Sequence, residues 1–367
     1  MREKKIDKVF LTIVLLLIFL GAAIFVSASL GILNRNQDTF YAVLISQLVL
    51  GMGFGLAGMY LTFKINYKLW CKYSFFIFFG AILLTAAVFI PHVGWSHQGA
   101  QRWIQIAGFS FQPVEILKFA FVIYFAAWLA WAKGRVQDFK FGILPLSIML
   151  AVIALILFHQ PDTKSFILIT VTGISMLFIS GVPIRYLLGI GALGVLVLGV
   201  LVLSKPYLQE RIKTFIDPSQ DARGSSYQIQ QSLIALGSGG MLGTGFGQSV
   251  QKFGYLPEPQ GDSVFAVIGE ELGFVGTVGI IFLYILFAWR GLRIANNSPD
   301  LFSRLLVSGI VILITAQSFM HIASVIGVFP LTGVPLVFIS HGGTSLMIYI
   351  MAIGIILQIS KYQKATA

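Results

Sequence analysis

The sequence has little cysteine and little charge. Its 367 residues include one cysteine, Cys71, which excludes an internal disulfide, and the five histidines are scattered, without the spacing of a zinc site. Charged residues make up 11% of the chain, and only 14 residues are acidic. Soluble domains carry about 25% charged residues. Disulfide, redox and zinc chemistry are therefore not expected, and neither is a soluble domain.

Long runs of apolar residues dominate the sequence. Hydrophobic residues make up 57% of the chain, and runs of the length that crosses about 30 Å of hydrocarbon recur throughout it. The first run, which follows MREKKIDK, is too long for a signal-peptide core, so we interpret it as an uncleaved span. We predict an all-α polytopic membrane protein with a single domain, 1–367, and about ten transmembrane helices near 9–31, 41–63, 73–92, 113–132, 142–159, 165–181, 184–204, 263–289, 304–324 and 341–360.

The basic residues indicate the orientation. An even number of spans puts both termini on one side, and the segments on that side hold sixteen lysines and arginines, against three in the short loops opposite. The positive-inside rule then predicts that both termini are cytoplasmic. The net charge of +11 is explained by these loops, so no nucleic acid is expected as a partner.

The longest connection, residues 205–262, joins the seventh and eighth spans and is predicted to lie outside the cytoplasm. Apolar residues recur at helical spacing in 206–217 and again in 225–236, which predicts two amphipathic helices on the membrane surface. The stretch GSGGMLGTGFG lacks the strand-then-helix context of a phosphate loop, so it is predicted to be a flexible or tightly turning connector.

Ionisable residues inside spans are candidates for function because they cost energy to insert. Glu115 and Lys118 are three apart on one helix face, either as a pair that lets the helix insert or as part of a site. Glu270 and Glu271 lie within the eighth span, where we predict structural ion pairs.

Asp262 directly precedes the eighth span and allows two interpretations. Aspartate before an apolar helix is a preferred N-cap. Alternatively, the carboxylate is held at the outer membrane face, where water and a lipid-borne substrate both reach it. A capping oxygen is less available as a base, so the two roles are only partly compatible.

Further polar groups are predicted on the same face. Arg102 and Trp103 precede Glu115, and Asp162 lies at the outer end of the fifth span. Ser340, Gly342 and Gly343 open the tenth span, where a helix N-terminus favours anions. Together these residues predict an outward-facing polar cavity with charges of both signs.

Six stretches occur in an order that is typical of one family. They are GAQRWI, FQPVEILK, QPD, YQIQQSLIALGSGGMLGTGFGQSVQKFGYLPE, DSVFAVIGEELG and GVPLVFISHGGTS. With them, nearly the whole chain resembles the SEDS family, the FtsW and RodA group of bacterial plasma-membrane proteins that polymerise the peptidoglycan precursor lipid II. The sequences of the stretches FIS and EPQGDS resemble the FtsW branch more than the RodA branch.

The resemblance implies an inverting glycosyl transfer from one lipid II to another, with undecaprenyl diphosphate as the leaving group. Asp262 matches the essential acid of the family, Trp103 its sensitive tryptophan, and Arg102 and Lys118 its basic residues. Such a transfer needs one base for the attacking hydroxyl and cations for the diphosphate. We predict Asp262 as the general base.

The predicted substrate contacts include three cations. No cofactor is expected, and a divalent cation could assist, although no ligand cluster supports one. The predicted substrate-binding residues are Arg102, Trp103, Lys118, Lys252, Glu115, Asp162, Ser340, Gly342 and Gly343.

The chain also departs from the family pattern. Lys164 stands where glycine is common, and His321 where asparagine is common. QGD, which ends at Asp262, replaces a common His-Thr-Asp. The acid itself is retained.

Partners and alternative functions follow from the same resemblance. A class B penicillin-binding protein, which is a transpeptidase, is the implied partner, together with other membrane proteins of cell-wall synthesis. A lipid II flippase would place its polar residues near the midplane with access from both sides. A scaffold that only recruits the transpeptidase would leave Asp262 as a helix cap.

Overall fold

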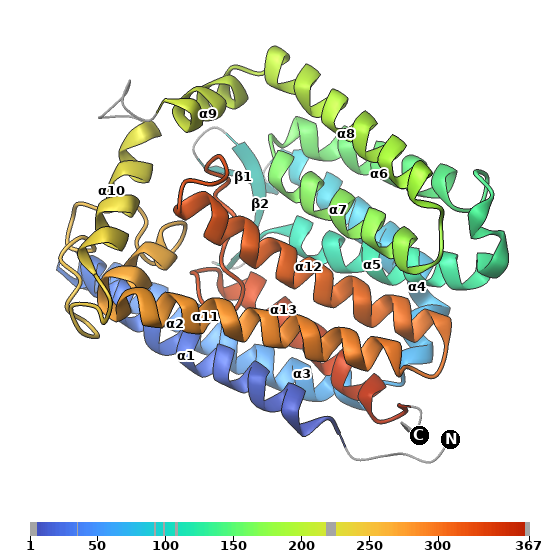
Figure 1. Ribbon diagram of the computed structural model, residues 1–367, viewed down its shortest axis with the longest axis horizontal. Helices are drawn as coiled ribbons and strands as arrows, with labels where there is room; N and C mark the ends of the chain where they lie inside the picture. The colour runs from blue at the N-terminus through green and yellow to red at the C-terminus, as the bar shows by residue number, and fades with distance from the viewer. Residues whose placement is uncertain are drawn as a thin grey trace.

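The computed structural model is a bundle of long helices, with a small sheet and two shorter helices near one end (Figure 1). The structure describes residues 6–34, 36–91, 93–97, 100–106, 109–217 and 225–363. Residues 218–224 of the predicted outer loop, and basic residues at both ends of the chain that were used to assign the orientation, lie outside these ranges.

Most described residues are helical. The α-helices are α1 (Lys8–Leu33), α2 (Gln37–Ile45), α3 (Phe54–Lys64), α4 (Tyr67–Ala86), α5 (Pro113–Ala132), α6 (Ile143–His159), α7 (Thr163–Ile179), α8 (Ile184–Ser204), α9 (Pro206–Ile216), α10 (Ser225–Ser238), α11 (Val264–Asn296), α12 (Leu301–Val325) and α13 (Gly343–Ser360). A π-helical segment, Ser46–Gly53, joins α2 to α3, and short 3₁₀ turns follow α4 at Ala87–Phe89 and α5 at Lys133–Gln137.

Each of the ten predicted spans coincides with an apolar helical segment. Within the described residues, eight such segments are long and apolar enough to cross a membrane. The remaining two, α6 and α7, have 17 residues each. The second predicted span is composite, because it runs through α2, the π-helical segment and α3. The chain is therefore a polytopic helical membrane protein.

Small residues let α13 approach the second span closely. A Cβ on Gly51 would lie 2.9 Å from the carbonyl oxygen of Gly343, and one on Gly58 would lie 2.5 Å from Met351. Glycines at such positions allow membrane helices to pack backbone to backbone. The start of α13 is thus fixed against the π-helical segment.

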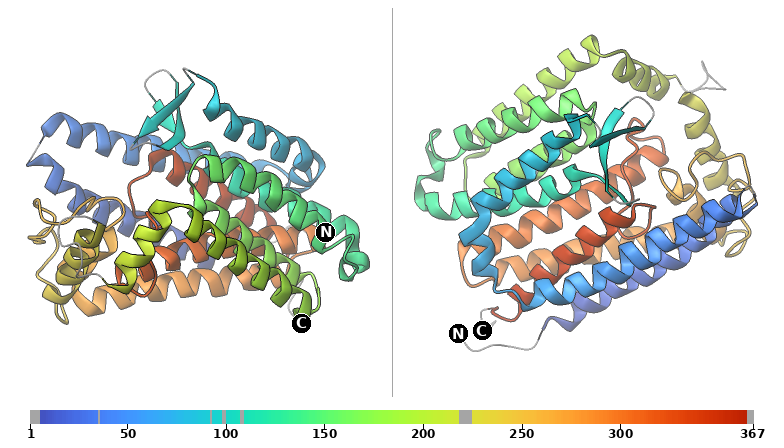
Figure 2. Two further views of the ribbon diagram at one scale, coloured as in Figure 1. Left: turned by 90° about the horizontal axis from the view of Figure 1, so that it is seen from above. Right: turned by 180° about the vertical axis from the view of Figure 1, so that it is seen from behind.

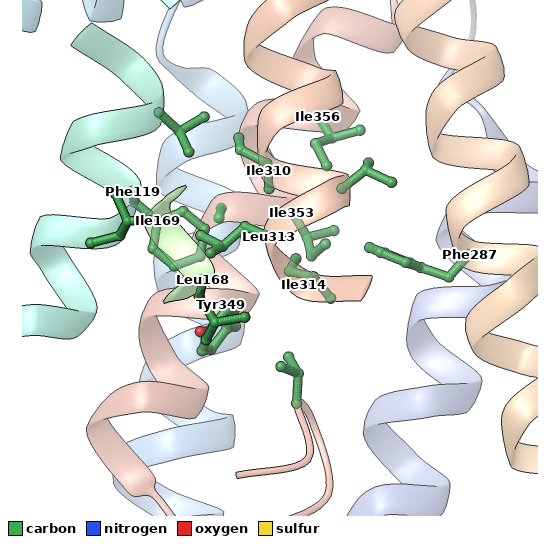
Figure 3. Packing of buried hydrophobic residues seen from close by; sticks show 14 of the residues in the cluster. Phe119, Leu168, Ile169, Phe287, Ile310, Leu313, Ile314, Tyr349, Ile353 and Ile356 are labelled. Atoms are coloured by element: carbon green, nitrogen blue, oxygen red, sulfur yellow. The ribbon is translucent and has the colours of Figure 1, made fainter. Parts of the chain in front are cut away.

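α12 lies at the centre of the bundle (Figure 3). Its residues Ile310, Leu313 and Ile314 pack among buried side chains of α5, α7, α11 and α13. Polar groups on α12 are shielded from lipid by these neighbours, and their hydrogen bonds must be made within the protein.

The segment between α4 and α5 departs from the all-helical prediction. It forms an antiparallel sheet of β1 (Gly94–His97), β2 (Ala100–Ile106) and β3 (Phe109–Phe111), in that order, with Trp95 paired to Trp103 (Figure 2). This stretch is outside the predicted spans and is rich in aromatic and β-branched residues, which favour strands. The sheet holds Arg102 and Trp103 in adjacent positions on β2.

The start of α1 and the ends of α11 and α13 lie together. Asp7 forms an ion pair of 2.9 Å with Arg290 of α11, and its backbone N–H donates to Ser360 Oγ of α13. Two helices that begin and end the chain thus meet at one end of the bundle, whereas α9 and α10 lie near the opposite end (Figures 1 and 2). This arrangement agrees with termini on one side of the membrane.

The glycine-rich connector is tightly bound to a break in α11. Gly273, inside α11, has φ 65° and ψ −163°, so the helical ladder is interrupted there. The break leaves carbonyl oxygens of α11 without helical donors, and backbone N–H groups of the connector donate to them instead. The N–H of Thr244 donates to the Glu270 carbonyl, and the N–H of Gly245 donates to the Glu271 carbonyl. The connector therefore turns tightly and replaces the missing helical hydrogen bonds.

Replacing Gly273 by alanine is expected to destabilise the protein strongly. Only glycine adopts this backbone conformation without a cost of about 1–3 kcal/mol, and a Cβ would lie 2.3 Å from the Gly243 nitrogen. The melting temperature in detergent measures the effect. Gly279→Ala in the same helix, where a Cβ meets no atom within 4 Å, is the matched control and should be neutral or stabilising. Equal melting temperatures for Gly273→Ala and wild type would contradict this account.

Candidate functional site around Asp262

Asp262 lies in the turn before α11, and its carboxylate is half-buried. The N-cap of α11 is Ser263, and no side chain forms a capping hydrogen bond there. Among the described residues, the Asp262 carboxylate makes no hydrogen bond or ion pair, and it does not cap α11. Its oxygens are available to a substrate.

Gly333 forms one wall against Asp262. It belongs to the segment 326–342 between α12 and α13 and has φ 62°. A Cβ at Gly333 would lie 2.9 Å from Asp262 Oδ2 and 3.6 Å from Lys164 Nζ. The left-handed backbone and the missing side chain let a carboxylate and an ammonium group pack against the same residue.

The carbonyl groups of four successive residues, 332–335, are each bound by a side chain from another element. We call these four residues the clamped segment. The bonds are Arg211 Nη1 to Thr332 (3.4 Å), Lys164 Nζ to Gly333, His321 Nδ1 to Val334 (2.7 Å) and Gln317 Nε2 to Pro335 (3.2 Å). α9, α7 and α12 thus jointly fix the position of Gly333. Because Gly333 contacts Asp262, these bonds also fix the wall of the site.

Two cations, Lys164 and Arg211, lie near Asp262, and a third, Arg102, lies near both of them. Lys164 interacts electrostatically with Asp162 and Asp262, and with Arg102 and Arg211. Arg102 donates to the carbonyls of Gln160 and Pro161. All three cations are therefore held by carbonyl oxygens, and among the described residues none lies within ion-pair distance of a carboxylate.

The electrostatics of Arg211 reflect this crowding of positive charge. Desolvation and the nearby charge of Arg102 lower the pKa of Arg211, whereas Asp262 and Asp162 act in the opposite direction. Like charges that lack a direct counterion form a favourable place for an anion.

The Asp162 carboxylate accepts hydrogen bonds from neighbouring groups of the protein. It is the N-cap of α7, and its carboxylate accepts from the backbone N–H of Ser165 at 3.3 Å and from Ser165 Oγ at 2.9 Å. Gln112 donates to the same carboxylate at 3.4 Å. Asp162 therefore fixes the start of α7 and, with it, the position of Lys164.

Glu115 and Lys118 form a buried ion pair of 2.8 Å, as their spacing predicts. Lys118 Nζ also donates to Gln317 Oε1 at 2.8 Å and lies 2.9 Å from the Tyr349 hydroxyl. Through Gln317 this network reaches Pro335 of the clamped segment. Lys118 is thus linked to the clamped segment through Gln317, and its ammonium is already paired with Glu115.

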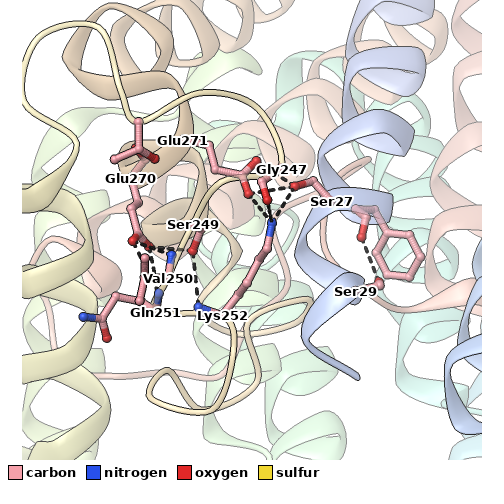
Figure 4. A network of polar contacts seen from close by, with 11 residues as sticks. Ser27, Ser29, Gly247, Ser249, Val250, Gln251, Lys252, Glu270 and Glu271 are labelled. Atoms are coloured by element: carbon pink, nitrogen blue, oxygen red, sulfur yellow. Dashed lines mark hydrogen bonds and ion pairs between the residues drawn. The ribbon is translucent and has the colours of Figure 1, made fainter. Parts of the chain in front are cut away.

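Lys252 lies in a second buried network (Figure 4). Its ammonium is 2.6 Å from Glu271 Oε1 and also donates to Ser27 Oγ and the Gly247 carbonyl. Lys252 therefore forms the structural ion pair expected for Glu271.

Glu270 differs from the expected ion pair. It accepts from Ser249 Oγ at 2.5 Å and from the backbone N–H of Val250 at 2.8 Å (Figure 4). No described cation lies within ion-pair distance of it. Neutral donors thus satisfy this buried charge, and they fasten the loop before Lys252 to α11.

The residues that open α13 have partners within the protein. Ser340 Oγ donates to the Gly261 carbonyl at 2.9 Å, which holds the residue before Asp262. The N–H of Gly342 donates to Gln47, and Gly343 is packed against Ser46. Gln47 therefore occupies the helix N-terminus that was expected to favour an anion.

Several residues of the site were not predicted. The sequence patterns do not single out Arg211, Gln317 or Gly333, and they mark His321 only as a departure from the family pattern. Gln317 and His321 are four apart in an apolar span, so they share a helix face, and this spacing was the available signal.

No group of three or more metal-ligating side chains occurs among the described residues.

The chain is similar to known proteins over nearly its whole length. The chain is 36% identical over 358 residues to stage V sporulation protein E of Bacillus subtilis (strain 168), covering 98% of both chains. It is 35% identical over 367 residues to the probable peptidoglycan glycosyltransferase FtsW of Geobacter sp. (strain M18), covering 100% of both.

Solved structures are also similar, one of them over nearly the whole chain. It is a chain from a peptidoglycan synthase complex that coordinates polymerization and crosslinking, with a TM-score of 0.77, 27% identity and coverage of 95% of this chain and 98% of that one. The family model for FtsW, RodA and SpoVE, described as cell cycle proteins, matches residues 7–365. The chain therefore belongs to the FtsW, RodA and SpoVE family.

Proposed function

We propose that this protein is a peptidoglycan polymerase that joins the glycan of one lipid II to another at the outer face of the bacterial plasma membrane. The observation that carries the proposal is a half-buried Asp262 whose carboxylate has no hydrogen-bond partner among the described residues and lies near a cluster of Lys164, Arg211 and Arg102. Relatives that match the whole chain are named peptidoglycan glycosyltransferases.

Asp262 is the proposed general base. The attacking sugar hydroxyl gives its proton to the carboxylate as its oxygen bonds to the anomeric carbon, and the bond to the diphosphate breaks on the opposite side, which inverts the configuration. A positioned base contributes typically about 10²- to 10⁴-fold to such a step. One carboxylate suffices, because the diphosphate leaves as an anion and needs no proton.

The proposed diphosphate contacts are Arg102, Lys164 and Arg211. They lie in the Asp262 cluster, whereas Lys118 and Lys252 are each paired with a glutamate in a buried network. Cations already fixed by carbonyl oxygens stabilise charge on the leaving group with little reorganisation. This assignment replaces Lys118 and Lys252 as expected diphosphate ligands.

An apolar cavity suits the lipid part of the substrate. It has a volume of about 510 Å³ and lies between α10, α11 and α12, where Phe265 and Ile322 contribute to its lining. These residues are close in sequence to Asp262 and His321, so an isoprenoid chain bound here would have its diphosphate near the proposed site.

The proposed partner is a class B penicillin-binding protein, which cross-links the glycan. The similar structure is part of a complex that coordinates polymerization and crosslinking.

The purified protein, together with its transpeptidase partner, is expected to convert lipid II into glycan polymer that can be resolved by gel electrophoresis. The same preparation in vesicles should not move lipid II between leaflets. Transport without polymer would favour a flippase, and neither activity from a folded complex would favour a scaffold.

A further inference from the structure

His321 lies on α12 behind the clamped segment and is 1% exposed. Its Nδ1 is 2.7 Å from the Val334 carbonyl oxygen. A carbonyl oxygen only accepts hydrogen bonds, so Nδ1 carries a proton in this contact. In the neutral imidazole, Nε2 is then a bare acceptor.

Nε2 of His321 has no hydrogen-bond partner among the described residues. A buried acceptor without a partner costs about 1–3 kcal/mol, and each such group in a native structure requires an explanation. A donor that is present at only one stage of the reaction would explain it.

The surroundings of α12 identify this donor. α12 packs against α5, α7, α10, α11 and α13, and α10 and α13 contain no charged residue. Asp262 is the charged group that acts on His321, and it packs against Gly333, the residue next to Val334, whose carbonyl His321 binds. The other charged groups at this end of the packing helices are already bound: Glu115 with Lys118, Glu271 with Lys252, Glu270 by N–H and O–H donors, and Lys164 by the Gly333 carbonyl.

We infer that His321 is a positioning residue whose Nε2 accepts a hydrogen bond from Asp262 once Asp262 has taken the proton of the attacking hydroxyl. This inference rests on the proposed function. The proton moves from the sugar oxygen to an Asp262 oxygen, stays there while it is shared with Nε2, and leaves to water from the half-exposed carboxyl group.

Such a contact favours the transition state over the ground state. The ionised Asp262 has no hydrogen to donate, so the bond to Nε2 is absent before proton transfer and forms as the proton arrives. Only interactions that strengthen toward the transition state raise kcat. The Val334 bond holds the ring in the required tautomer, as a second partner does for histidines at other active sites.

Two substitutions distinguish the roles of the two ring nitrogens of His321. An asparagine amide reaches about the Nδ1 position, so His321→Asn keeps a donor for Val334 and loses the acceptor. A glutamine reaches about the Nε2 position, so His321→Gln restores an acceptor. We expect His321→Asn to lower kcat about 10-fold with KM for lipid II unchanged, and His321→Gln to recover much of that loss.

His341 provides a matched control. Its Nε2 also lacks a partner among the described residues, but its ring stacks on Phe25, and it lines a cavity with Asp38 rather than with Asp262. His341→Asn should leave kcat unchanged. In an Asp262→Ala protein, which has no proton to share, adding His321→Asn should lower the residual rate no further.

Nuclear magnetic resonance of protein labelled with ¹⁵N-histidine tests the tautomer without turnover, with the His321 signals assigned by their loss in His321→Asn. Nδ1 should be protonated and Nε2 bare. A protonated Nε2 overturns the inference, as does a rise in KM at constant kcat or an equal loss in the Asp262→Ala background. If wild type makes no polymer, the proposed function fails. The tautomer measurement still shows whether Nε2 of His321 is a bare acceptor.

Discussion

Replacing Asp262 by asparagine is expected to lower the rate of glycan polymerisation by about 10²- to 10⁴-fold, the usual contribution of a general base. The amide has nearly the same shape and cannot take a proton. Because the Asp262 carboxylate makes no described hydrogen bond and does not cap α11, its loss should leave the folded state intact. The initial rate of polymer formation and the melting temperature of the same preparations measure the two effects.

Glu258→Gln is the matched control for Asp262→Asn. Glu258 is an exposed carboxylate four residues earlier in the same loop, and its side chain accepts from Gln260 Nε2 at 3.1 Å, which a glutamine can still do through its Oε1. Its substitution therefore removes one negative charge nearby and keeps this contact. Its polymerisation rate should stay close to that of wild type. Wild-type activity in a folded Asp262→Asn protein would falsify the assignment of the base.

The positions of the helices could be predicted because membrane spans are local features of the sequence. Each apolar run of sufficient length gave a helix, and the spacing of Glu115 and Lys118 gave an ion pair on one helix face. The break at Gly273 was not predicted, since a single glycine within an apolar run carries no sign of the connector that replaces the helical hydrogen bonds.

The site around Asp262 could be predicted only in part, because its members meet over long sequence separations. Lys164 and the Gly333 carbonyl are 169 residues apart, and Arg211 and the Thr332 carbonyl are 121 apart. Both bonds use backbone acceptors, which every residue has, so no side-chain pattern marks the clamped segment. The acid was identified by resemblance, whereas two of its neighbouring cations required the three-dimensional arrangement.

This arrangement also changes the interpretation of the lysines. The family resemblance predicts Lys118 near the diphosphate, but its ammonium forms an ion pair with the Glu115 carboxylate. Lys164, which departs from the family pattern, lies near Asp262 instead. A buried ammonium that is fully paired has little remaining capacity to bind an anion. Positive charge at the site is instead supplied by groups that carbonyl oxygens hold in place.

Lys118→Met is expected to destabilise the protein by about 3–5 kcal/mol, because it leaves the Glu115 carboxylate buried without a counterion. The two side chains are only 2% and 6% exposed. Gln317 also loses its lysine partner, and with it the support for its bond to Pro335 of the clamped segment. Melting temperature and polymer yield should therefore fall together.

The double variant Lys118→Met/Glu115→Gln decides whether this pair is structural. Replacing both members of a buried pair by neutral groups of similar size is often close to neutral for stability, so the melting temperature should return most of the way to that of wild type. If the pair acts only by holding Gln317 and the clamped segment, polymerisation recovers with stability. Recovered stability without recovered polymerisation would show instead that the Lys118 charge itself reaches the substrate, and it would return Lys118 to the diphosphate site.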